Sequence, residues 1–171
     1  MIASLQKQKY KKNNYFLIHG RFEPYKYLDL VINTFKDLDT NLVVSGNGSE
    51  FDKYRKRTYK NIKFVFKPTD SELVKLYSNA KAFIMPQEED FGITAVEAQS
   101  FGLPVIAYKS GGSLDTVIDG KTGLFFTKQT TGSLIEAIAK FDTVSFNSGY
   151  LRTNAKRFSK EVFKKNFLKN I

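Results

Sequence analysis

Two glutamates eight residues apart form the pattern of this chain that is most informative about chemistry. Glu89 follows a short apolar run that ends at Pro86, and Glu97 lies in the stretch 93–101, which has helical spacing. In an open α/β sheet, ligands sit beyond the carboxyl ends of the strands, so both side chains are predicted to face a ligand crevice. There a carboxylate can accept two hydrogen bonds from a ribose. The alternative is that Glu89 is a surface acid and Glu97 only stabilises the helix start. The spacing alone leaves both open.

The residues between the two glutamates offer main-chain groups to a ligand. The amides of Gly92, Ile93 and Thr94 stand at the start of the predicted helix, where free N–H groups favour an anion. Phe91 and Gly92 supply a backbone that a ligand can approach closely, because glycine has no Cβ.

Two cations in the sequence HGRFEPYK form a second group of candidate residues. Arg21 follows a predicted strand and Lys26 comes just before a predicted helix. Together they could grip a diphosphate, arginine as a fork and lysine as a point charge. The alternative is that Arg21 pairs with Glu23 at the surface and that Lys26 is only solvated. The neighbouring His19 is predicted to be a packed, hydrogen-bonded residue at a strand end.

Glycines follow the predicted strands at positions where a backbone could meet a phosphate or a sugar. Gly20 precedes the first cation, Gly46 and Gly48 follow the second strand, and Gly111 and Gly112 follow a later one. Ordinary tight turns would explain Gly46 and Gly48 nearly as well. Neither loop has the sequence of a P-loop or of the GxGxxG dinucleotide motif.

Length and composition predict one domain without cysteine or zinc chemistry. The 171 residues are 42% hydrophobic, which suffices for a single core. The chain has no cysteine and one histidine, which excludes disulfides, cysteine nucleophiles and a histidine-rich zinc site. Neither a bilayer-spanning apolar run nor a signal peptide is recognisable, so a cytoplasmic location is expected. The net charge of +10 is compatible with a phosphorylated ligand, a nucleic acid or an anionic membrane, although most lysines read as solvated helix faces.

Short apolar runs alternate with amphipathic stretches, a pattern typical of an α/β domain with a parallel sheet. Helices are predicted around the apolar face that begins at Leu28, after a capping box of Thr69 and Glu72, over 93–101 and over 133–141, and in two final stretches. The predicted strands cover residues 15–19, 41–45, 62–66, 82–85 and 105–108.

With these elements in order, the chain resembles the carboxyl-terminal domain of the family-four retaining glycosyltransferases of the GT-B type. Within that family its sequence is most similar to mannosyltransferases. The resemblance covers about 15–167 and rests on five segments: GRFEPYK, GNGSE, LVKLYSNAKAFIMP, EEDFGITAVEAQSFGLPVIA and GGSLDTVIDGKTGLFF. It implies a Rossmann-like domain whose parallel sheet is flanked by helices, one half of a GT-B fold. Two positions depart from the family: Asp115 stands where glutamate is common, and a glycine is usual near Lys67.

The resemblance also implies roles for the candidate residues. Arg21 and Lys26 would bind the donor diphosphate in place of a divalent metal, so no cofactor is expected, and Glu97 would hold the ribose. Glu89 would contact the transferred sugar together with the backbone that follows it. Catalytic roles are therefore implied for Arg21, Lys26 and Glu89, and binding roles for Gly20, Gly46, Gly48, Phe91, Gly92, Ile93, Thr94 and Glu97.

The implied function is donor binding for transfer of a hexosyl group, from GDP-mannose, to a glycan or lipid-linked acceptor in polysaccharide biosynthesis. Three alternatives stay open: a non-catalytic nucleotide-sugar module that works with a partner subunit, a nucleic-acid-binding domain, and a sugar-phosphate epimerase of related fold. Nucleic acid is not expected as a partner, because the two glutamates would repel a polyanion, and an epimerase would need histidines from another domain.

The domain organisation follows from the same resemblance. Residues 1–14 are predicted to be a polar lead-in or linker, and 15–171 the nucleotide-sugar-binding domain with crossover helices from about 144. The family's amino-terminal acceptor domain has no counterpart in this sequence, so the chain is expected to bind a donor without transferring its sugar. Apolar surface is expected on the final helices, which carry Phe158, Phe163 and Phe167, and a peripheral contact with the inner membrane face is left open.

Overall fold

A six-stranded parallel sheet forms the centre of the structure, a computed structural model that describes residues 15–168. The predicted lead-in, 1–14, lies outside the described residues. Neighbouring strands follow the order β3-β2-β1-β4-β5-β6, and every pair is parallel. This is a doubly wound order. The strands are β1 (Tyr15–Arg21), β2 (Asn41–Asn47), β3 (Ile62–Phe66), β4 (Ala82–Met85), β5 (Val105–Tyr108) and β6 (Gly123–Phe126).

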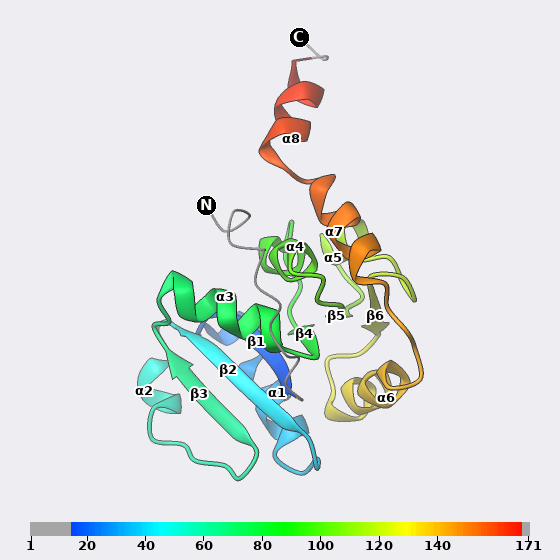
Figure 1. Ribbon diagram of the computed structural model, residues 1–171. Helices are drawn as coiled ribbons and strands as arrows, with labels where there is room; N and C mark the ends of the chain where they lie inside the picture. Colours follow the sequence, from blue (N-terminus) through cyan, green and yellow to red (C-terminus); the bar gives the residue numbers. More distant parts are fainter. Residues whose placement is uncertain (1–14, 169–171) are drawn as a thin grey trace.

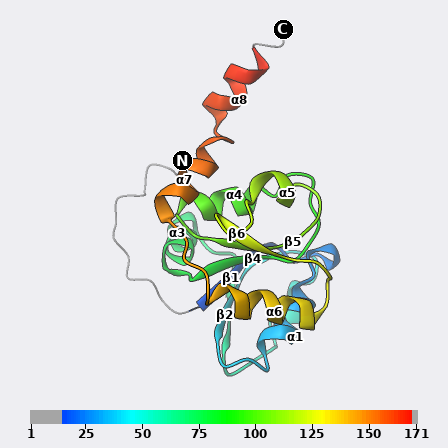
Figure 2. The same ribbon diagram turned by 90° about the vertical axis from the view of Figure 1, so that its right-hand side faces the viewer.

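Helices cover both faces of the sheet, as parallel strands require (Figures 1 and 2). One face carries α1 and α6, and the other carries α3, α4, α5 and α7, while α8 projects away from the body. The helices are the 3₁₀ helix η2 (Pro24–Lys26), α1 (Leu28–Phe35), α2 (Phe51–Tyr54), α3 (Asp70–Asn79), α4 (Ile93–Ser100), α5 (Ser113–Thr116), α6 (Thr131–Phe141), α7 (Ser148–Lys156) and α8 (Lys160–Phe167).

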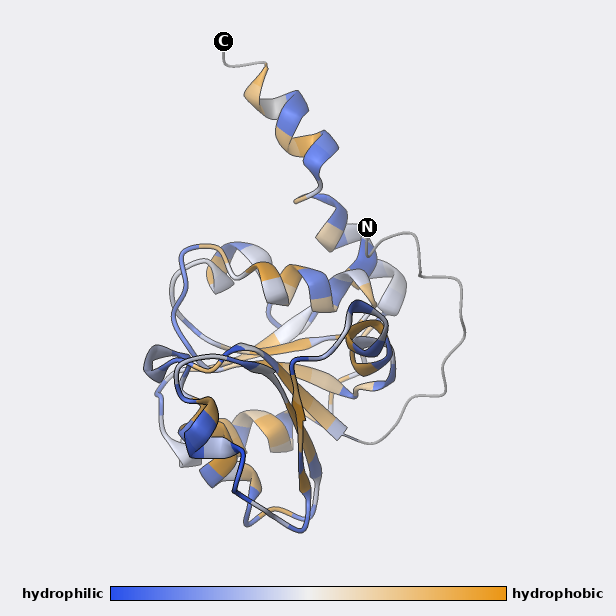
Figure 3. Cartoon of the chain, turned by 90° about the vertical axis from the view of Figure 1, so that its left-hand side faces the viewer, coloured by the Kyte–Doolittle hydropathy of each residue, from blue (hydrophilic) through white to orange (hydrophobic). Residues whose placement is uncertain are grey.

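Each face of the sheet packs its own apolar layer, and the strands are hydrophobic in Figure 3 while the helices alternate. On the α1 side, Phe16 of β1 packs against Phe35 and Phe141 in edge-to-face contacts. On the α4 side, Leu17 of β1 and Met85 of β4 are fully buried. Successive strand residues point to opposite faces, so buried runs on both faces produce the short continuous apolar segments of the sequence.

The order of the strands determines where a ligand can sit. The chain leaves β1 toward β2 and leaves β4 toward β5, so the connections diverge between β1 and β4. Ligands of open α/β folds bind beyond the carboxyl ends of the strands at this kind of divergence. The segments that leave β1 and β4 there are 22–27 and 86–92, which contain the candidate lysine and the first candidate glutamate.

The predicted fold class, a parallel sheet flanked by helices, is confirmed, and three strands have the predicted bounds. The first two strands are each two residues longer than predicted. Arg21 is therefore the last residue of β1, and Gly46 belongs to β2 instead of to a turn, because it pairs with Gly20 on one side and Phe66 on the other. The predicted capping box of α3 is formed: Thr69 accepts from the Glu72 amide, and the Glu72 carboxylate accepts from the Thr69 amide.

The carboxyl-terminal helices leave the body in two steps. Leu151 and Asn154 of α7 are buried against the domain, whereas α8 extends outward and exposes Phe163 and Phe167 (Figure 1). The predicted apolar surface on the final helices is thus present in α8. Among the helices of residues 15–168, none is both long and apolar enough to span a bilayer.

Candidate functional site

An ion pair between Lys26 and Glu89 joins the segments that follow β1 and β4. The Lys26 Nζ contacts the Glu89 Oε1, and the two side chains are only 15% and 18% exposed. The buried Gln87 side chain donates a second hydrogen bond to the same oxygen, at 2.9 Å. Two residues predicted from separate motifs therefore meet across the divergence of the strands, and Lys26 is not merely solvated.

Opposing effects act on the pKa of the Lys26 amine. Burial lowers the pKa of its amine, and the positive charge of Arg21 lowers it further. The carboxylate of Glu89 acts in the opposite direction, because an adjacent negative charge favours the ammonium form. An anionic ligand could supply the same stabilisation, so Lys26 is suited to exchange Glu89 for a phosphate oxygen.

Arg21 projects from the end of β1 into solvent, with 77% of its side chain exposed. One guanidinium nitrogen donates to Glu23 at 3.2 Å, so the surface pair considered as an alternative is formed. Ser49 holds the same carboxylate with its amide and, at 2.6 Å, its hydroxyl, and these bonds lower the pKa of Glu23. Arg21 is thus near Lys26 but turned toward Glu23, and a rotation of its exposed side chain would be needed to reach a shared ligand.

The glycines after β1 and β2 allow two backbones to lie against each other. A Cβ at Gly46 would overlap the carbonyl oxygen of Gly20, and one at Gly48 would overlap the backbone of Phe22. These two glycines therefore have a packing reason that does not involve a ligand. Gly20 differs, because a Cβ there would meet nothing within 4 Å, and its backbone lines a narrow cavity together with His19, Arg21, Lys26 and Gln87.

An open cavity of about 420 Å³ lies beside the ion pair. Its wall is the loop after β4 together with one aromatic side chain from η2, and the lining residues are Tyr25, Glu88, Glu89, Asp90, Phe91, Gly92 and Ile93. Four predicted residues thus share one cavity. Among residues 15–168, no group of three or more His, Asp or Glu side chains could hold a metal ion.

The glycine pair after β5, Gly111 and Gly112, packs against the backbone of this loop. The Gly112 amide donates to the Glu89 carbonyl at 2.7 Å, and a Cβ at Gly112 would come within 2.5 Å of the Asp90 carbonyl oxygen. A Cβ at Gly111 would come equally close to the Glu89 carbonyl oxygen. Gly111 and Gly112 therefore position the Glu89 backbone.

The helix α4 begins at the cavity. Its N-cap, Gly92, has φ 75° and ψ 52°, a left-handed conformation that glycine adopts without strain. Thr94 is half-buried in the first turn, and Glu97 lies on the second turn. Burial raises the pKa of the Glu97 carboxyl, and the Tyr77 hydroxyl, which donates to Glu97 at 3.5 Å, acts against this rise. The structure thus places Glu97 beside Tyr77.

Three residues that contact the candidate site residues or line the cavity were not predicted from the sequence: Gln87, Tyr25 and Tyr77. Gln87 was detectable in principle, because it follows the buried strand β4 and its Pro86 at a ligand-facing end. The two tyrosines carry no such signal, since their positions depend on tertiary contacts. His19 is half-buried, its Nδ1 lies 3.4 Å from the Ser45 hydroxyl, and burial lowers its pKa, as expected of a packed residue.

The family described as glycosyl transferases group 1 matches residues 3–158 of the chain. An uncharacterized glycosyltransferase of Methanocaldococcus jannaschii is 31% identical over 153 residues, which cover 86% of this chain and 44% of that protein. The alpha-1,3/1,6-mannosyltransferase of Dictyostelium discoideum is 27% identical, with 92% of this chain and 44% of that protein covered.

A solved structure shares the fold at low sequence identity. The crystal structure of Anabaena HepE in complex with UDP superposes with a TM-score of 0.75 and 20% identity, and the match covers 92% of this chain and 48% of that one. The chain thus spans less than half the length of these three proteins.

Proposed function

The chain belongs to the family of glycosyl transferases group 1, and we propose that it is the donor-binding part of a retaining hexosyltransferase. Its fold is one half of the GT-B type. The proposed donor is a nucleoside diphosphate sugar, and the proposed acceptor is a glycan or a lipid-linked glycan. The observation that carries the proposal is the Lys26–Glu89 pair, which stands beside an open cavity where the strand connections diverge.

Lys26 and Arg21 are the proposed diphosphate ligands. When the bond between the sugar and the diphosphate breaks, negative charge grows on the leaving diphosphate, and nearby cations stabilise that charge. Lys26 would exchange Glu89 for a phosphate oxygen, and exposed Arg21 would leave Glu23. The bare backbone of Gly20 beside them allows close approach of a phosphate. Because these cations neutralise the diphosphate, we propose a reaction without a metal or other cofactor.

Glu89, once released by Lys26, is the proposed partner of the sugar hydroxyls. Its carboxylate lines the 420 Å³ cavity together with the backbone of Phe91, Gly92 and Ile93. The first amides of α4 point out of the helix end, where N–H groups lack intrahelical acceptors, so Thr94 and its neighbours favour the anionic side of the donor.

The nucleoside is proposed to lie on the β2 side of the divergence. Glu97 would accept hydrogen bonds from the ribose hydroxyls, since each carboxylate oxygen has two lone pairs. Gly46 and Gly48 would form part of the floor under the nucleotide, in addition to their packing role. The proposed donor is GDP-mannose. The sequence of the EEDFGITAVEAQ segment and the similarity to the Dictyostelium mannosyltransferase support this choice.

Acceptor binding is proposed to belong to a part outside this chain. The relatives are more than twice as long as the matched region, and a two-domain enzyme performs its chemistry in the cleft between its halves. We therefore expect this chain alone to bind the donor without transferring its sugar.

The proposal can be tested by measuring melting temperatures of the chain with GDP-mannose, GDP, UDP-glucose, UDP-N-acetylglucosamine and ADP-glucose. Each ligand is added first with a chelator and then with magnesium. A ligand at 100 times its dissociation constant adds about 2.7 kcal/mol of stability, which raises the melting temperature measurably. We expect a shift with one nucleotide that does not depend on magnesium, and no shift with any of them would contradict the proposal.

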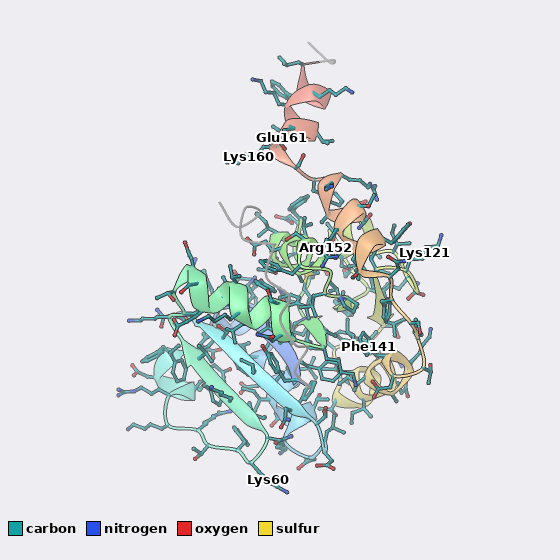
Figure 4. The ribbon with its side chains drawn as sticks, in the orientation of Figure 1. Lys60, Lys121, Phe141, Arg152, Lys160 and Glu161 are labelled. Carbon is teal, nitrogen blue, oxygen red and sulfur yellow. The ribbon has the colours of Figure 1, made fainter. Side chains whose placement is uncertain are left out.

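Matched lysine variants connect this result to the site. Lys26→Ala is expected to weaken donor binding by about 1 to 3 kcal/mol, the scale of a lost charged hydrogen bond. Lys60→Ala is the control, because Lys60 is exposed just before β3, at the opposite end of the strands (Figure 4). Equal affinity of the two variants would remove Lys26 from the site.

A further inference from the structure

Tyr77 of α3 is a buried tyrosine whose ring is fixed from three sides. It is 1% exposed. The ring of Phe101 stacks on it at 5.3 Å with an interplanar angle of 8°, and Phe83 packs at 5.8 Å. His19, at the carboxyl end of β1, meets it edge-on at 6.1 Å. These contacts leave the ring one orientation, so the position of its hydroxyl is set by the packing of the domain.

The Tyr77 hydroxyl donates to the Oε2 of Glu97 at 3.5 Å. Burial raises the pKa of Tyr77 well above its usual value, so the phenol remains a donor at every physiological pH. Burial also raises the pKa of Glu97, whereas the hydrogen bond from Tyr77 favours its charged form. Tyr77 therefore does two things to Glu97: it favours one position of a carboxylate oxygen, and it favours the ionised carboxylate against the effect of burial.

We propose that Tyr77 is a positioning residue that orients Glu97 toward the ribose diol of the donor. The inference rests on the proposed function, in which Glu97 accepts from the ribose. With Oε2 held by Tyr77, that oxygen keeps one lone pair for a ribose hydroxyl, and Oε1 is directed to the other hydroxyl. Recognition of a diol requires both oxygens at defined positions, and a freely rotating carboxylate on a helix surface would meet this requirement poorly.

A merely structural role for this contact predicts something different. In that case Glu97 satisfies a buried phenol, and removal of the hydroxyl changes stability without changing what the nucleotide site recognises. The test must therefore measure ribose recognition itself.

Tyr77→Phe keeps the ring and removes only the donor. The affinities of GDP and 2′-deoxy-GDP, and of UDP and 2′-deoxy-UDP, are measured by calorimetry between pH 5 and pH 8 for the full chain. We expect Tyr77→Phe to weaken binding of the ribonucleotide about tenfold and that of the deoxynucleotide much less, so that the preference for ribose narrows. We also expect the loss of ribonucleotide binding on acidification to begin at a higher pH in the variant.

Tyr54→Phe is the matched control, because Tyr54 is also fully buried and also donates to a glutamate, Glu50, at 3.4 Å, on the other face of the sheet. Its preference for ribose should equal that of the unmodified chain. In a Glu97→Gln background, Tyr77→Phe should change the preference no further.

The outcomes separate the two proposals. An unchanged preference and an unchanged pH dependence in Tyr77→Phe would overturn the role of Tyr77 alone, whatever happens to stability. Absence of nucleotide binding by the unmodified chain would overturn the proposed function, and the inference with it.

Discussion

Lys67 shows how a backbone angle explains a departure noticed in the sequence. It follows β3 with φ 48°, a left-handed conformation that costs a residue with a side chain roughly 1 to 2 kcal/mol. A glycine is usual near this position in the family that the sequence resembles, and glycine adopts the conformation freely. The amide of Lys67 donates to the Gly46 carbonyl at 3.0 Å, which ties this residue to the end of β2.

Lys67→Gly is therefore expected to stabilise the domain by about 0.5 to 1 kcal/mol in urea unfolding, since the relief of strain exceeds the added entropy of the unfolded glycine. Loss of the Lys67 contact with the Phe51 ring limits the gain. Lys63→Gly, in the middle of β3, is the control and should lose about 0.5 to 1 kcal/mol. Destabilisation by both substitutions would mean that the lysine side chain, not its backbone, determines stability at position 67.

Glu97 is expected to lower the free energy of unfolding at neutral pH, where its carboxyl is charged. Burial raises its pKa, so the folded state favours the protonated form more than the unfolded state does. The contribution of Glu97 to stability is then greatest below the unfolded pKa and is lost as pH rises through the folded pKa. Glu97→Gln should accordingly raise the free energy of unfolding at pH 7, and this advantage should shrink as pH approaches 4.

The pKa of Glu72 shifts in the opposite direction to that of Glu97. Hydrogen bonds from the Thr69 amide and hydroxyl lower the Glu72 pKa, so its contribution is present at neutral pH and is lost on acidification. Urea unfolding of Glu97→Gln and Glu72→Gln at pH 7 and pH 4 compares the two. If Glu97→Gln were no more stable than the unmodified chain at pH 7, burial would not be the dominant influence on Glu97.

The sequence identified the charged residues of the candidate site better than it identified their supports. Lys26 and Glu89 stand out because strand ends and glycine-rich loops mark ligand-facing positions, and the structure brings them into contact. Their roles remain predictions. Tyr77 lies 20 residues from Glu97, in a helix after a different strand, and no local pattern links the two. Such partners become visible only when the packing of the sheet is known.

At the scale of elements, a buried polar cluster attaches α7 to the helix that starts at the cavity. The Asn154 side chain donates to the Gln99 side chain at 2.7 Å and to the Thr116 carbonyl at 2.9 Å, and Gln99 donates to the same carbonyl. The side chains of Asn154 and Gln99 are buried. Asn154→Ala would leave the Gln99 oxygen without its donor, and we expect a loss of about 1 to 3 kcal/mol in urea unfolding.

Thr153→Ala is the neighbouring control, because Thr153 is exposed on the same helix and its hydroxyl bonds only within that helix, to Gly149. Its effect should stay within about 0.5 kcal/mol. Equal effects of the two substitutions would show that helix propensity, and not the polar cluster, holds α7.

Elements with a strong local signal were predictable, and those that depend on a neighbour were not. The capping box announced α3. The strand β6 was missed, because it begins with Gly123 directly after a polar segment that reads as a turn. It exists as a strand because β5 supplies a hydrogen-bonding edge. Neighbouring strands also explain the two unpredicted residues at the end of β2: Gly46 pairs with both β1 and β3, and Asn47 pairs with Arg21 of β1.

At the scale of the whole molecule, α7 and α8 differ in how they relate to the body. Leu151 of α7 is fully buried, whereas Phe163 and Phe167 of α8 are 70% and 57% exposed. Figure 4 shows Lys160 and Glu161 on α8 well away from the sheet, and Arg152 where α7 meets the domain. The Phe158 ring, between the two helices, contacts Phe91 of the cavity edge-on at 5.6 Å. Residues up to Phe158 are therefore expected to contribute to the stability of the domain, and those after it to contribute little.

Two truncations test this boundary. A chain that ends at Ser159 removes α8, and its melting temperature should fall by no more than about 4 °C, the effect of roughly 1 kcal/mol in a domain of this size. Because the stacked rings of Phe163 and Phe167 leave with it, light scattering should also show less self-association. A chain that ends at Thr143 loses α7 as well, and the cavity left by Leu151 alone should cost about 2 to 5 kcal/mol. If removal of α8 lowered the melting temperature as strongly as removal of both helices, α8 would have to pack against the body in solution. The aromatic face of Phe163 and Phe167 would then be an internal contact and not an exposed surface.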